Sequence, residues 1–137
     1  MEHIITNIKG PVLALASKIC CEAGRYNIFS VVLVHISLPI AFQEDTVYAR
    51  NEEAKAYLKK HYKKYEWVSP IDANHIDEEA LGNHLAIERT AYYMGRDIEQ
   101  VILCDAILMC PGWENSKGCK CEKFVAEIYG KEVLIMQ

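Results

Sequence analysis

The sequence predicts an α/β domain, a Rossmann-like open parallel sheet of about four or five strands flanked by helices. One observation is the β-branched apolar run at residues 30–37, which is typical of a central parallel strand buried on both faces. Another is the alternation of strand-like and helix-like segments along the chain. This alternation implies right-handed crossovers and helices on both faces of the sheet.

Each predicted element has a local chemical signal. In chain order they are a strand at 30–37, a helix from about 46 to 62, a strand at 67–69, a helix at 86–100, a strand at 102–109, a helix from about 116 to 129 and a strand at 131–136. Asp45 or Thr46 can cap the first of these helices, Pro70 stops the second strand, and Gly130 ends the last helix. The polar, irregular stretch at 71–86 is a long loop of the kind in which compact domains place function.

Composition indicates one globular domain. We interpret residues 1–27 as a strand and helix extension, a candidate interface element, and residues 28–137 as the α/β domain itself. The net charge of −4 predicts no nucleic-acid partner. The longest apolar stretch, residues 28–42, contains His35 and Pro39 and is too short to span a membrane, so we expect a cytoplasmic protein without a membrane partner.

The six cysteines are expected to be free thiols, because the chain reads as a cytosolic α/β domain. Cys119 and Cys121 form a C-x-C, which lacks the paired C-x2-C spacing of structural zinc sites. We therefore expect no metal and no cofactor.

The loop and helix start around residues 111–122 carry the most informative chemistry. Ligands of open α/β sheets lie beyond the carboxyl ends of the strands, where such loops gather. A helix N-terminus favours a phosphate, Ser116 can add a hydroxyl donor, and Gly118 lets a ligand approach the backbone. Glu122 would then stand a sugar's length from the phosphate.

A second carboxylate completes a coherent mechanism for cleaving an N-glycosidic bond. Glu122 could attack the anomeric carbon while a second carboxylate handles the proton on the base. Structural alternatives stay open for each residue: the helix dipole alone favours Glu122, Ser116 can be only an N-cap, and Asp97 can be a solvated helix residue. Asp105, inside an apolar strand, more often ties down a neighbouring backbone than catalyses.

The run from Tyr93 to Glu122 resembles the nucleoside 2-deoxyribosyltransferase-like superfamily, most closely its small bacterial and phage branch, the DUF4406-type domains. The resemblance covers about residues 30–136. It implies that Glu122 is the nucleophile and that Asp97, eight residues before the strand aspartate Asp105, is the acid/base residue.

The pattern Ser116-x-Gly118-x-x-x-Glu122 is similar to that of the 5′-monophosphate-specific hydrolases, in which the serine binds phosphate. The resemblance also implies that the first loop contributes to the ligand site, although this loop lacks the glycines and the arginine of those hydrolases. The ligand-binding residues expected from both loops are Ser37, Leu38, Pro39, Ile40, Gly112, Trp113, Asn115, Ser116 and Gly118.

These observations predict a nucleotide-processing N-glycosidase or (deoxy)ribosyltransferase that acts on a nucleoside 5′-monophosphate or a nucleoside through a glutamate nucleophile. The alternative is a non-catalytic binder that sequesters or senses a nucleotide-derived metabolite in the same pocket. A third interpretation is a structural oligomer assembled by the N-terminal helix. The resemblance implies a homodimer or higher homo-oligomer, because neighbouring subunits often complete sites in this superfamily.

Overall fold

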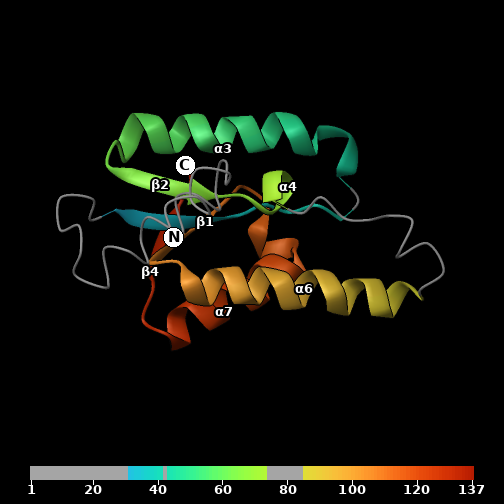
Figure 1. Ribbon diagram of the computed structural model, residues 1–137. Helices are drawn as coiled ribbons and strands as arrows, with labels where there is room; N and C mark the ends of the chain where they lie inside the picture. The colour runs from blue at the N-terminus through green and yellow to red at the C-terminus, as the bar shows by residue number, and fades with distance from the viewer. Residues whose placement is uncertain (1–30, 42, 74–84) are drawn as a thin grey trace, which may run out of the picture.

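The computed structural model describes residues 31–41, 43–73 and 85–137 of the chain (Figure 1). Its strands are β1 (Val32–Ser37), β2 (Tyr65–Val68), β3 (Ala106–Met109) and β4 (Glu132–Ile135). Its helices are α3 (Val47–His61), α4 (Pro70–Ala73), α6 (Ala86–Leu103) and α7 (Lys117–Ile128), with short 3-10 turns η2 (Glu44–Thr46) and η3 (Trp113–Asn115). The predicted extension at 1–27 and most of the polar loop at 71–86 lie outside the described residues.

The four strands form one parallel sheet in the order β2-β1-β3-β4, which confirms the predicted fold class. Helix α3 covers one face of the sheet, and α6 and α7 cover the other (Figure 1). The chain moves outward from β1 to β2 and then returns to place β3 on the other side of β1. The switch point of the topology therefore lies between β1 and β3, where open α/β sheets bind ligands.

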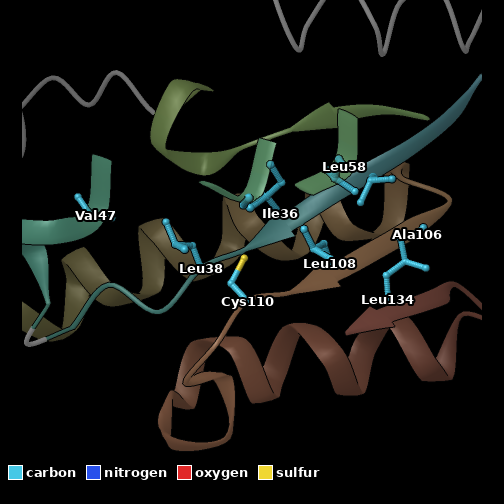
Figure 2. Packing of buried hydrophobic residues seen from close by; sticks show 10 residues of the cluster. Ile36, Leu38, Val47, Leu58, Ala106, Leu108, Cys110 and Leu134 are labelled. Atoms are coloured by element: carbon cyan, nitrogen blue, oxygen red, sulfur yellow. The ribbon is translucent and has the colours of Figure 1, made fainter. Parts of the chain in front are cut away.

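Alternation along β1 divides its side chains between the two faces. Val34 and Ile36 pack with Leu58 of α3 and Leu108 of β3 in the main apolar cluster (Figure 2). Since successive side chains of a strand point to opposite faces, His35 and Ser37 point to the face that α6 and α7 cover. These two polar residues are fully buried there.

The predicted strand at 102–109 is wrong in its first half. Ile102 and Leu103 complete α6, and β3 begins only at Ala106. The helix extends this far because Val101, one residue earlier, is 1% exposed and packs in the apolar cluster beneath α7. Asp105 therefore precedes β3, and its Oδ2 accepts a hydrogen bond from the Leu33 amide at 2.9 Å. This confirms the backbone-tying interpretation of Asp105.

The last helix ends as its sequence predicts. Gly130 has φ = 68°, and its amide donates to the Glu127 carbonyl while the Lys131 amide donates to the Ala126 carbonyl. This bond pair is the Schellman motif, in which glycine accepts the left-handed conformation without a steric penalty. At the start of α3, Thr46 occupies the N-cap position, but its hydroxyl donates to the Gln43 carbonyl and caps no helix amide.

No helix within the described ranges is long and apolar enough to cross a bilayer.

Candidate active site

Two loops meet beyond the carboxyl ends of β1 and β3. The Cys110 amide donates to the Ser37 carbonyl at 3.1 Å, which extends the pairing of the two strands to the loop starts. Gly112 has φ = 89°, and a Cβ on it would lie 3.8 Å from Pro39 Cγ in the first loop. The switch point is thus bordered by residues 38–41 on one side and 110–116 on the other.

Glu122 projects from α7 toward this region. It belongs to the buried stripe of the helix together with Cys119 and Ala126, at the spacing of one helical face. The residue is 5% exposed. An ionised carboxylate at such a position needs hydrogen-bond donors, because burial without them is costly.

Both donors come from β1. Glu122 Oε1 lies 2.7 Å from His35 Nε2, and the Ser37 hydroxyl donates to Oε2 at 2.8 Å. Two residues apart on one strand, His35 and Ser37 share a face, which lets them hold the two oxygens of one carboxylate. Within this network, His35 and Ser37 are each bonded to Glu122 and not to one another. The arrangement therefore lacks the Ser–His hydrogen bond that activates a serine nucleophile.

A thiol extends this network toward the start of α7. Burial raises the pKa of Cys119, the hydroxyls of Ser116 and Ser37 oppose the rise, and the charges of Glu122 and Asp97 add to it. The thiol is therefore protonated near neutral pH and is not a nucleophile. The hydroxyls of Ser37 and Ser116 thus both lie within hydrogen-bond reach of this sulfur.

Ser116 is the N-cap of α7, which confirms the capping interpretation of this residue. Its Oγ accepts a hydrogen bond from the Cys119 amide at 3.2 Å. The cap uses the oxygen as an acceptor, which leaves the hydroxyl proton for donation to another group. Capping and phosphate binding are therefore compatible at this residue.

Gly118 has a structural reason to be glycine. A Cβ there would lie 3.3 Å from the Met94 sulfur, so the close packing of α6 on the start of α7 occupies this space. Asp97 lies on α6 one turn beyond Met94 and is half-buried. The predicted ligand contact at Gly118 stays a prediction.

The other predicted ligand residues are placed differently from one another. Leu38 is 7% exposed and packs in the main core with Ile36 and Leu108 (Figure 2). Glu122 instead contacts His35 and Ser37, on the other face of β1. Pro39 is buried and Ile40 is 38% exposed at the loop surface. In the second loop, Trp113 packs beside the cluster under α7 with Lys123 over its ring, and Asn115 is exposed.

The described residues contain no group of three or more histidine, cysteine or carboxylate side chains arranged to hold a metal ion. Cys119 is buried and Cys121 is exposed, so the two thiols of the C-x-C do not converge. The four cysteines in the described ranges are free thiols.

A family model matches the part of the chain that contains α7. Residues 75–135 match the family described as Domain of unknown function (DUF4406). The DUF4406 match contains Asp97, Ser116 and Glu122 but not β1 with His35 and Ser37. No curated protein is matched by the sequence.

Among solved structures, the chain is similar to a 2-deoxyribosyltransferase from Leishmania mexicana, with a TM-score of 0.52 and 20% sequence identity. The match covers 77% of this chain and 63% of that chain, so the protein spans less than two thirds of that enzyme's length. The chain therefore has a nucleoside deoxyribosyltransferase-like fold.

Two residues of this region were not recognised from the sequence. His35 was read only as an interruption of an apolar stretch, although it and Ser37 share one parity in the strand, a signal of two polar groups on one face. Arg50 of α3 donates to the Pro39 carbonyl at 2.7 Å and to the Gln43 carbonyl at 2.9 Å, and so braces the first loop. No local pattern marks Arg50, because its partners are carbonyls set by the loop conformation.

Proposed function

We propose that this protein cleaves or exchanges the N-glycosidic bond of a nucleoside or nucleoside 5′-monophosphate, with Glu122 as nucleophile. The observation that supports this most is the buried carboxylate of Glu122 at the switch point, held through both oxygens by His35 and Ser37. A carboxylate fixed in this way is pre-oriented for attack, and each oxygen keeps a second lone pair.

The proposed reaction has two steps. One oxygen of Glu122 bonds to the anomeric carbon while the bond to the base nitrogen breaks, and the base leaves with the electron pair and a proton from Asp97. In the second step, water or an incoming base attacks the anomeric carbon and loses a proton to Asp97. The bond between the anomeric carbon and Glu122 breaks at the same time, which restores the Glu122 carboxylate. Water gives hydrolysis, and a second base gives transfer.

The start of α7 is the proposed phosphate subsite. Ser116 supplies a hydroxyl at the N-cap, and the helix dipole favours negative charge at this end. The distance from an N-cap to a residue in the second turn of a helix suits a phosphate bound at one end of a sugar and a nucleophile at the other. This is the argument for a 5′-monophosphate over a free nucleoside.

Chromatography of a nucleoside and nucleotide panel, incubated with purified protein, tests the proposal by detecting free base. Release that depends on the 5′-phosphate supports the monophosphate substrate, and base exchange only in the presence of a second base supports transfer. Glu122→Gln should abolish release, whereas Glu127→Gln, the same change at an exposed position of the same helix, should preserve it.

Turnover that survives in Glu122→Gln would remove this residue from the mechanism. The second candidate function, a binder of a nucleotide-derived metabolite, uses the same pocket without chemistry. This binder function is supported if the panel yields no free base while a nucleotide raises the melting temperature of the protein. A chain that no nucleotide stabilises would instead support the structural oligomer.

A further inference from the structure

His35 is a polar residue in a position that packing alone would fill with an apolar one. It is fully buried in β1, and the residues beside it in the sheet are Val68 of β2 and Ile107 of β3. Leu33 lies on the same strand and the same face and is fully buried in an apolar cluster, so this environment accepts an apolar side chain. The imidazole of His35 therefore needs an explanation beyond the core.

The imidazole contacts Glu122, whose Oε1 lies 2.7 Å from Nε2, while Nδ1 is buried without a partner among the described residues. An ionised carboxylate only accepts hydrogen bonds, so Nε2 carries the proton. A proton on Nδ1 as well would be a buried donor without an acceptor, which is unfavourable. The geometry thus selects the neutral Nε2–H tautomer.

The direction of β1 distinguishes the two oxygens of Glu122. Ser37, which holds Oε2, lies two residues closer to the carboxyl end of the strand than His35, which holds Oε1. That displacement is about 6–7 Å along a strand. Oε2 therefore faces the edge where a ligand enters, and Oε1 faces the interior.

We propose that His35, as its Nε2–H tautomer, is a positioning residue that anchors the inner oxygen of Glu122 and so presents the outer oxygen to the anomeric carbon. This inference rests on the proposed function of Glu122 for its catalytic consequence. The contact itself is independent of any reaction.

Kinetics of base release test the catalytic consequence. His35→Phe keeps an aromatic ring but removes the donor, and we expect kcat to fall by about a hundredfold with KM within about threefold, as for a misplaced reacting group. His35→Gln restores an N–H near the position of Nε2 and should recover at least about tenfold of that loss. His61→Gln, at an exposed residue on α3, is the matched control and should leave both constants unchanged. A Gln variant as slow as the Phe variant, or a rise in KM alone, would overturn the proposal.

Nitrogen-15 NMR of the imidazoles tests the contact without turnover. The chain has five histidines, and loss of one signal set in His35→Gln assigns His35. We expect the Nε2–H pattern with a slowly exchanging ring proton, altered by Glu122→Gln while the His61 signals stay in place. The Nδ1–H pattern, or no response to Glu122→Gln, would refute the anchoring role. An intact Nε2–H pattern in a protein that releases no base would instead overturn the proposed function and retain His35 as the anchor of Glu122.

Discussion

Replacement of Asp105 by alanine is expected to destabilise the fold by removing a clamp between β1 and β3. Asp105 Oδ2 accepts from the Leu33 amide at 2.9 Å, and the Asp105 amide donates to the Leu33 carbonyl at 2.8 Å. Leu33 is fully buried, so in Asp105→Ala its amide loses an acceptor that water cannot readily replace. An unsatisfied buried donor costs about 1–3 kcal/mol.

The middle of that range, about 2 kcal/mol, corresponds to a fall in melting temperature of roughly 6–10 °C for a domain of this size. Asp105→Asn keeps a side-chain oxygen and should lose less than about 1 kcal/mol, the share due to the charge. Circular dichroism measures the melting temperatures, and hydrogen exchange of the Leu33 amide localises the effect.

Two controls make the result interpretable. Glu53→Ala, at an exposed position of α3, should change stability by less than about 0.5 kcal/mol. Asp105→Asn should retain base release, because its side chain serves the backbone of β1 and not the substrate. If Asp105→Ala has the melting temperature of the wild type and its Leu33 amide stays protected from hydrogen exchange, the clamp is refuted. The structural explanation for the Asp105 carboxylate is then refuted as well.

Other substitutions separate the roles assigned above. Ser116→Asp retains an N-cap acceptor but places a negative charge at the proposed phosphate subsite, so the melting temperature should hold while KM for a 5′-monophosphate rises at least about tenfold; an unchanged KM would exclude phosphate binding there. Burial raises the pKa of Cys110 to about 12 from the ordinary 9.0, and this group's contribution to stability is therefore complete below about pH 9 and is lost as the pH rises from 9 toward 12. Urea unfolding should show a loss of about 1 kcal/mol between pH 8 and pH 10 that Cys110→Ala lacks. The expected homo-oligomer can be tested on α7, where Phe124 is 64% exposed beside the exposed Cys121 and offers an apolar contact surface. Light scattering should show dissociation in Phe124→Glu but not in Tyr48→Glu, the same change at a 73% exposed residue on α3, and an unchanged mass in Phe124→Glu would exclude this face.

The elements that the sequence predicted well are those with chemical signals at their ends. Helix α7 has a serine N-cap and a glycine after its last turn, and both boundaries fall where expected. The junction of α6 and β3 has no such signal: residues 101–109 form an apolar run whose first part is helix and last part is strand. Periodicity cannot divide a run of this kind, and tertiary packing of Val101 decides where the helix ends.

The candidate site was predictable to the extent that it lies in one segment. Ser116 and Glu122 belong to a single loop and helix, and their pattern could be recognised along the chain. The partners of Glu122 could not be identified in this way, because His35 lies 87 residues away and meets it only through the order of the strands. The parity of His35 and Ser37 indicates a polar face, but only the placement of α7 over that face shows what the two residues hold.

Stability alone does not account for a carboxylate at position 122. The buried stripe of α7 on either side of it consists of Cys119 and Ala126, and an apolar residue between them would need no donors from β1. Burial of a polar network is often no more stabilising than well-packed apolar side chains of similar volume. Here the network also occupies His35 and Ser37, the last two residues of β1 that face α7, at the end of the strand beside the switch point. A carboxylate buried among hydrogen-bond donors, at the position where this fold class binds ligands, is what the proposed catalytic role of Glu122 requires.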